Sequence, residues 1–208
     1  MSTKKDKFSQ KDKKFMSLAL SLASARHGLT GENPSVGCVI VKNDEVISIG
    51  QTSYNGRPHA EYNAIKDSNE ALEGSTMYVT LEPCNHFGQT PPCTKEIIKN
   101  KIGKIIYSVD DVDEKVKGKS LKILKSKNII VKKGLLHEEI TDFYKTYFFN
   151  RKNKIPYVTG KIAMSKNYLI YSKGAKKITD IHSDKLTHFL RYKNDSLMIS
   201  YKTLNQDN

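Results

Sequence analysis

The sequence lacks long hydrophobic runs and an even set of cysteines. No stretch approaches the roughly 18 consecutive apolar residues that a membrane span needs, and the charged start MSTKKDKFSQKDKKF has no apolar segment of signal-peptide type. The cysteine count is three, an odd number that argues against a disulfide framework and favours a reducing compartment. These absences predict a cytoplasmic protein with no membrane partner.

Arginine is also scarce, although the chain is strongly basic. The 208 residues carry a formal net charge of +13, but of the 35 basic residues only Arg26, Arg57, Arg151 and Arg191 are arginine. Lysine is a solvated point charge, whereas arginine is the usual choice for bidentate phosphate and base contacts. We therefore expect a solvated, lysine-rich surface and no nucleic-acid partner. Nucleic-acid binding and attraction of a phosphorylated small substrate are the alternative interpretations of the charge.

Helical and strand-like patterns alternate along the first three quarters of the chain. Apolar residues at i, i+3, i+4, i+7 and i+8 spacing predict a helix over 12–27. Further helices are expected at 59–72, 92–99, 118–127 and 136–149, and strands at 36–41, 46–49, 76–81, 104–109 and 129–132. The alternation predicts an α/β domain whose helices cover a central sheet.

The composition changes near residue 150, which suggests a domain boundary. Polar and basic residues at 151–155 predict a linker, followed by a strand at 156–159, a helix at 178–191 and a strand at 196–200. The last segment is too short for a second core of its own. The expected organisation is a basic lead-in (1–11), a first domain (12–150), the linker (151–155) and a partial second domain (156–208).

Three short segments carry the residue types of a metal site. His59-Ala60-Glu61 opens an expected helix, Pro83-Cys84 follows an expected strand, and Cys93 lies near the start of the next helix. One imidazole and two thiolates suit Zn²⁺ with a fourth position kept for water. Helix N-termini favour thiolate over thiol, and zinc lowers the pKa of bound water towards 7. Glu61 is not itself a ligand, so it can act as the proton shuttle.

Two other side chains need weighing against this set. Cys38 lies in an apolar run and is expected to be a core residue. His86 could compete with His59 as a ligand, but we expect it to face the substrate.

A histidine, a Glu two residues later, Pro-Cys and a second cysteine together form the signature of zinc nucleobase deaminases. Here the cysteines are separated by eight residues, 85–92, and not by the usual two.

The motifs resemble the bifunctional deaminase/reductase family of riboflavin biosynthesis. The resemblance rests on Asn33-Pro34-Ser35-Val36-Gly37-Cys38-Val39-Ile40-Val41, His59-Ala60-Glu61 and the segment from Thr80 to Thr90-Pro91-Pro92-Cys93. It implies a three-layer α/β/α, cytidine-deaminase-like domain that deaminates 2,5-diamino-6-ribosylamino-4(3H)-pyrimidinone 5′-phosphate. It also implies that Asn33 contacts this phosphorylated pyrimidine, that His86 lines the pocket, and that the chain is a homo-oligomer.

The remainder of the chain resembles the start of the family's reductase domain, which uses NADPH. By this resemblance Arg191 would contact the phosphoribosyl part of the substrate, and Thr203 and Asp207 would contact the cofactor. We expect this incomplete α/β reductase part to be inactive. Within the deaminase part, Thr52 replaces a usual histidine, Gln89 a usual lysine or arginine, and Asp113-Glu114 a usual Asn-Pro.

Two alternative functions compete with this interpretation. A nucleoside or tRNA deaminase would share the zinc site, but it usually has only two residues between its cysteines. A zinc-stabilised module without catalysis would lose the shuttle carboxylate, whereas Glu61 is present. Release of ammonia from the pyrimidine would separate the catalytic interpretation from the non-catalytic one.

Overall fold

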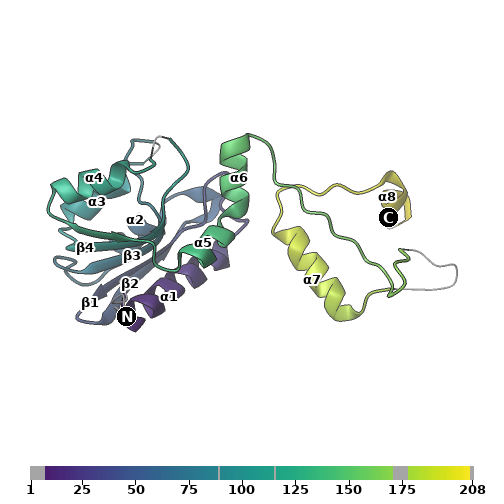
Figure 1. The fold of residues 1–208 in the computed structure, drawn as a ribbon, viewed down its shortest axis with the longest axis horizontal. Coiled ribbons are helices and arrows are strands. Elements are labelled where there is room, and N and C mark those ends of the chain that lie inside the picture. The colour runs from purple at the N-terminus through teal and green to yellow at the C-terminus, as the bar shows by residue number, and fades with distance from the viewer. Residues whose placement is uncertain (1–7, 89, 115, 171–177, 207–208) are drawn as a thin grey trace, which may run out of the picture. The chain divides into compact units, whose positions relative to one another are not determined.

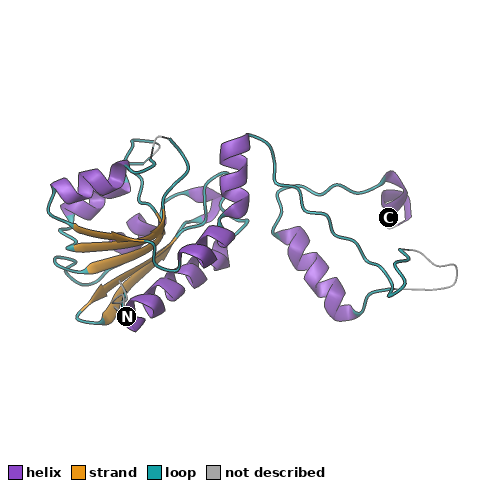
Figure 2. Ribbon diagram, viewed as in Figure 1, coloured by secondary structure: helices purple, strands orange, loops and turns teal. Residues whose placement is uncertain are grey.

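The chain divides into two compact units, Met1–Pro156 and Tyr157–Asn208 (Figure 1). The structure, a computed structural model, describes residues 8–88, 90–114, 116–170 and 178–206. Most of the expected lead-in lies outside the described residues, and the first helix already begins at Gln10. Within the described chain every strand belongs to the first unit (Figure 2).

A five-stranded mixed sheet forms the centre of the first unit. Its order is β2-β1-β3-β4-β5, and the bounds are β1 (Gly37–Lys42), β2 (Glu45–Gln51), β3 (Thr76–Leu81), β4 (Lys104–Val109) and β5 (Ile130–Lys133). Strand β1 runs antiparallel to both neighbours, whereas β3, β4 and β5 are parallel. The carboxyl ends of β3 and β4 therefore meet at one edge, where ligand sites of α/β sheets form.

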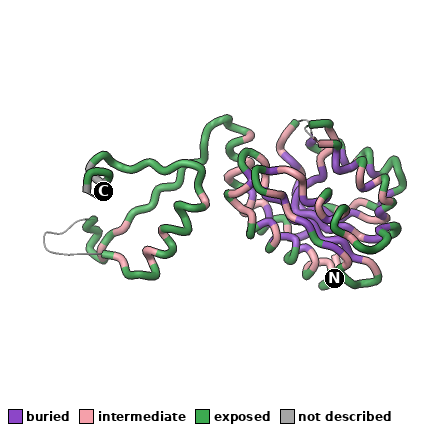
Figure 3. Tube along the Cα trace, turned by 180° about the vertical axis from the view of Figure 1, so that it is seen from behind, coloured by how far each residue is buried: buried purple, intermediate pink, exposed green. Residues whose placement is uncertain are grey.

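Helices cover both faces of this sheet, which confirms the expected α/β class. The bounds are α1 (Gln10–Arg26), η1 (Tyr54–Gly56), α2 (Ala60–Lys66), α3 (Cys93–Lys99), α4 (Lys119–Ser126), α5 (His137–Phe143) and α6 (Lys145–Asn153). Helices α2, α3 and α4 lie side by side on one face, and α1 and α5 lie on the other (Figure 1). Burial is concentrated in the strands between these layers (Figure 3).

Two glycines set the distance between helices and sheet. A Cβ atom at Gly37 in β1 would lie 1.8 Å from the carbonyl oxygen of Ala19 in α1. A Cβ atom at Gly50 in β2 would lie 2.2 Å from the carbonyl oxygen of Ala60 in α2. Both distances are too short for any side chain, so the backbones of α1 and α2 contact the sheet directly.

Helix boundaries differ most from expectation in two helices of the first unit. The helix expected over 59–72 ends at Lys66. The helix expected over 136–149 is two helices that meet at Tyr144, and the second continues to Asn153. The linker predicted at 151–155 therefore overlaps α6. Hydrogen bonds of the Tyr144 hydroxyl to Thr80 and Ser35 fix the junction of the two helices.

The second unit contains helices and extended segments. Its helices are α7 (Ile181–Tyr192), with Asp180 as N-cap, and α8 (Tyr201–Gln206). The strands expected at 156–159 and 196–200 are wrong, because these described segments are extended but pair with no strand. No described residue of this unit is buried, and a unit of this size buries too little apolar surface to form a core by itself. Among the helices described in either unit, none has the length and apolar character to cross a membrane.

Candidate metal centre and active-site cavity

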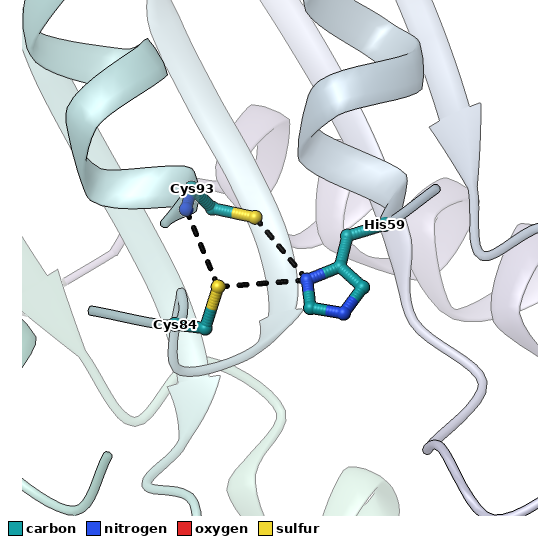
Figure 4. A group of neighbouring side chains, drawn as sticks. All are labelled: His59, Cys84 and Cys93. Carbon is teal, nitrogen blue, oxygen red and sulfur yellow. Dashed lines mark hydrogen bonds between the residues drawn. The ribbon is translucent and has the colours of Figure 1, made fainter. Parts of the chain in front are cut away.

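His59, Cys84 and Cys93 converge from three segments of the first unit (Figure 4). His59 is the N-cap of α2, Cys84 lies in the loop after β3, and Cys93 is the first residue of α3. The Nδ1 atom of His59 lies 3.3 Å from the sulfur of Cys93 and 3.5 Å from that of Cys84. The predicted metal-binding residues are thus close enough to share one ion.

The donor set fits zinc in chemistry and in spacing. Tetrahedral coordination with the usual Zn–S and Zn–N bond lengths places nitrogen and sulfur about 3.6 Å apart, close to the two separations found here. The backbone N–H of Cys93 donates to the sulfur of Cys84 at 3.3 Å. Hydrogen bonds from the Cys93 side chain and from His59 lower the pKa of the Cys84 thiol to about 4. Such a thiolate is the ligand form of cysteine.

Cys38 does not join this group. Its side chain is fully buried within β1, and burial raises the pKa of its thiol well above the usual value. The prediction of a core cysteine is therefore confirmed.

Glu61 lies in the first turn of α2, two residues after His59. Only 4% of the residue is exposed, and it lines a cavity of about 260 Å³ next to the metal-binding side chains. Burial raises the pKa of Glu61 to about 7, although the nearby charge of His59 acts in the opposite direction. A carboxyl group titrating near neutral pH is suited to move protons in both directions.

Asn33 and His86 line the same cavity as the metal-binding side chains and Glu61. Asn33 lies in the loop before β1, and His86 in the loop between the two cysteines. The Nδ1 atom of His86 is buried and has no hydrogen-bond partner in the described part of the chain. A buried nitrogen of this kind is available to a ligand, which agrees with the expected position of His86 in the pocket.

Glu82 is a cavity residue that the sequence analysis did not single out. It is 3% exposed, and its carboxylate accepts backbone N–H groups from Gly118 at 3.0 Å, Ser120 at 3.3 Å and Asp111 at 3.4 Å. Burial raises the pKa of Glu82. These hydrogen bonds join the loop after β3 to the segment after β4. Asp111 and Asp113 in that segment also line the cavity.

A chain of hydrogen bonds supports the loop that carries Asn33. The N–H of Gly37 donates to the hydroxyl of Thr80 at 3.2 Å, Thr80 is 2.6 Å from the hydroxyl of Tyr144, and Tyr144 donates to the carbonyl of Ser35 at 2.9 Å. Tyr144 is 2% exposed. Its hydroxyl therefore links the junction of α5 and α6 to the backbone two residues after Asn33.

Two of the departures from the family pattern, Thr52 and Asp113, line the cavity. Thr52 is buried in the cavity wall and accepts the N–H of Val36 at 2.9 Å. Gln89 lies outside the described residues.

The candidate reductase residues belong to the second unit. Arg191 is exposed on α7 of the second unit, Thr203 belongs to α8, and Asp207 lies outside the described residues. Their assigned roles in binding substrate and NADPH remain predictions.

Comparison with known families defines the class of protein. The profile of the cytidine and deoxycytidylate deaminase zinc-binding region matches residues 9–109, which include His59, Glu61, Cys84 and Cys93. The match and the donor group agree in defining a zinc-binding deaminase domain.

Individual relatives narrow the class. The chain is 42% identical over 146 residues to the diaminohydroxyphosphoribosylamino-pyrimidine deaminase of Buchnera aphidicola subsp. Schizaphis graminum, covering 70% of this chain and 99% of that protein. It is 36% identical over 198 residues to the riboflavin biosynthesis protein RibD of Aquifex aeolicus, covering 94% of this chain and 56% of that protein. The chain belongs to this family of riboflavin-biosynthesis deaminases.

A solved structure extends the agreement to the fold. The diaminohydroxyphosphoribosylaminopyrimidine deaminase/5-amino-6-(5-phosphoribosylamino)uracil reductase from Thermotoga maritima matches with a TM-score of 0.87 at 32% identity, covering 95% of this chain and 57% of that one. The resemblance drawn from the motifs and the expected fold class are therefore confirmed. The chain spans just over half the length of the Aquifex and Thermotoga relatives and nearly all of the Buchnera deaminase.

Proposed function

We propose that this chain hydrolytically deaminates 2,5-diamino-6-ribosylamino-4(3H)-pyrimidinone 5′-phosphate to 5-amino-6-(5-phosphoribosylamino)uracil. The observation that carries the proposal is the placement of a buried carboxyl group, Glu61, in one cavity with the zinc-type donors His59, Cys84 and Cys93. The names of the matched relatives support the choice of substrate. The wide spacing of the two cysteines favours this substrate over a nucleoside or a tRNA.

In the proposed reaction the residues divide the work between binding and proton transfer. His59, Cys84 and Cys93 would hold zinc, which supplies a Lewis acid that activates water at neutral pH. Glu61 takes a proton from the water and delivers it to the departing amino group, so that a C–O bond forms, the C–N bond breaks and ammonia leaves. Asn33 and His86 would hold the pyrimidine against these groups.

The test of the proposal is ammonia release by the zinc-loaded protein and by Glu61→Gln. Glutamine keeps the size and hydrogen bonding of glutamate but cannot accept the proton. We expect zinc to be retained and turnover to drop by about 10²- to 10⁴-fold, whereas the exposed Glu70→Gln control keeps full activity. Normal turnover by Glu61→Gln would refute the shuttle role. Deamination of a nucleoside or tRNA, without deamination of the phosphorylated pyrimidine, would refute the substrate.

The second unit enters the proposal as the beginning of a reductase domain. Alignment with the Aquifex protein extends over most of this chain, which supports the view that residues from 156 onward correspond to the family's reductase part, after a deaminase domain at 12–150. In a completed domain Arg191 would contact the phosphoribosyl group, and Thr203 and Asp207 would contact NADPH.

We further propose that the chain works as a homo-oligomer in the cytoplasm. Many apolar side chains of the second unit are exposed, among them Val158 and Met198, and this supports association, because burying exposed apolar side chains is favourable. The free thiols of Cys84 and Cys93 suit a reducing compartment. Light scattering after gel filtration tests the first inference, and cell fractionation tests the second.

A further inference from the structure

Two of the four arginines of this chain line the active-site cavity, and no lysine is among the described residues that line it. Chance alone would favour lysine, because 31 of the 35 basic residues are lysine. The same wall carries four carboxyl groups, those of Glu61, Glu82, Asp111 and Asp113. Those of the four that are ionised would repel a phosphorylated substrate unless a fixed cation compensated for their charge.

Arg57 projects from the segment just before His59 onto the loop between the two cysteines. Its Nη1 atom donates to the hydroxyl of Thr90 at 2.8 Å. Its Nη2 atom lies so near Gly88 that a Cβ atom there would approach it to 3.2 Å. The guanidinium is therefore held on the loop in which Gln89 replaces a usual basic residue of the family.

Arg151 reaches the cavity from the last turn of α6. Its Nη2 atom donates to the carbonyl of Glu32 at 3.1 Å, and the centre of its guanidinium lies 5.5 Å from the ring centre of Tyr147. Its Nε atom is buried and has no hydrogen-bond partner among the described residues. Within that part of the chain neither Arg57 nor Arg151 forms a salt bridge.

Both arginines line the cavity together with Asn33, and each is linked to the loop that carries it. Arg151 hydrogen-bonds to the residue before Asn33. Arg57 follows Gly56, and Gly56 packs tightly against Asn33. A Cβ atom at position 56 would lie 2.3 Å from the Nδ2 atom of Asn33. Planar guanidinium groups match phosphate oxygens with paired hydrogen bonds, which an ammonium group cannot do.

We infer that Arg57 and Arg151, which line the same cavity as Asn33, form an anion site that binds the 5′-phosphate of the substrate. Arg57 supplies the charge that Gln89 does not. The inference rests on the proposed function for the identity of the substrate, but the site itself recognises any ribose 5-phosphate group of suitable reach.

Binding of ribose 5-phosphate, measured by calorimetry on the zinc-loaded protein, tests the site without catalysis. Arg57→Ala and Arg151→Ala are each expected to weaken binding by about 10- to 100-fold, whereas the exposed control Lys125→Ala leaves it unchanged. Arg57→Lys keeps the positive charge without the planar guanidinium, and its affinity for ribose 5-phosphate is expected to lie between those of the wild type and Arg57→Ala. If either alanine variant fails to fold, Arg57→Gln and Arg151→Gln give the same comparison. Unchanged affinity in both arginine variants would overturn the inference.

Kinetics then separate this inference from the proposed function. In both alanine variants KM for the phosphorylated pyrimidine should rise, whereas KM for its dephosphorylated nucleoside stays that of the wild type. Equal KM effects on the two substrates would refute phosphate recognition. If the wild type releases no ammonia from either pyrimidine, but Arg57→Ala still loses ribose 5-phosphate binding, the proposed function fails and the anion site stands.

Discussion

Replacing Glu82 by alanine tests how the two loops of the cavity are held together. The carboxylate accepts backbone N–H groups from Gly118, Ser120 and Asp111, so the substitution removes three acceptor contacts at once. The longest of these, 3.4 Å to Asp111, is too weak to count. Two buried or half-buried donors remain without a partner.

The magnitude follows from these two donors. An N–H left unsatisfied in the interior costs about 1–3 kcal/mol, which gives roughly 2–6 kcal/mol for the pair. Gly118 is partly exposed, so water can replace its lost acceptor, and the lower half of the range, about 2–4 kcal/mol, is expected. For a unit of this size each kcal/mol lowers Tm by about 2–4 °C, so the melting temperature should fall by roughly 5–15 °C.

Thermal unfolding followed by circular dichroism measures this effect. The matched control is Glu73→Ala, because Glu73 is exposed and forms only a surface ion pair with Lys101 at 3.4 Å, worth at most about 1 kcal/mol. If Glu82→Ala melts within the error of the wild type while Glu73→Ala does the same, the contacts of Glu82 do not hold the loops.

The pH dependence of Glu82→Gln provides a second check on the same group. Burial raises the pKa of Glu82 above its usual value. The stabilising effect of such a group is complete below the pKa of the unfolded chain and is lost as pH rises through the raised pKa. Wild-type stability relative to Glu82→Gln is therefore expected to decline as the pH rises above 4.5, the ordinary pKa of a glutamate. A constant difference would contradict the raised pKa.

Three further predictions concern the metal, the core and the second unit. Cys84→Ser should lose most of its zinc in metal analysis, because a donor of the three-residue group is weakened; full zinc content would exclude Cys84 as a ligand. Tyr144→Phe should lower the free energy of unfolding by about 1–3 kcal/mol, since Thr80 and Ser35 lose the hydroxyl between them; an unchanged denaturant midpoint would contradict this. The 208-residue polypeptide should not oxidise NADPH when the deaminated product is supplied. Nicotinamide sites form where several strands end, and the described part of the second unit contains no strand; steady loss of NADPH absorbance would refute this.

The sequence predicted best what depends on neighbours along the chain. The strands expected at 76–81 and 104–109 agree with β3 and β4 residue for residue, because both segments are rich in the β-branched, aromatic and other apolar residues typical of buried strands. The set of His59, Glu61, Cys84 and Cys93 was also visible, because their spacing places each close to the start of a helix or the end of a strand.

Contacts between distant segments were not predictable in this way. Nothing local marks Tyr144, whose hydroxyl bonds to a carbonyl 109 positions away. Arg57 and Arg151 were noticed only as rare residues, since their meeting at one cavity depends on the tertiary fold. The strand expected at 196–200 failed for a similar reason, because a β pattern becomes a strand only when another strand accepts its hydrogen bonds.

Gly50 gives the site a constraint that its own motifs do not reveal. Gly50 lies on β2 and is not part of the lining of the active-site cavity. Helix α2 nevertheless packs against its backbone, and α2 carries Glu61 with His59 at its start. Even a methyl group at position 50 would lift that helix away from the cysteines. In a survey of all single substitutions, this glycine would therefore be as intolerant as the catalytic motif. Attempts to reshape the pocket for other pyrimidines must therefore keep the distance between α2 and β2 that Gly50 sets.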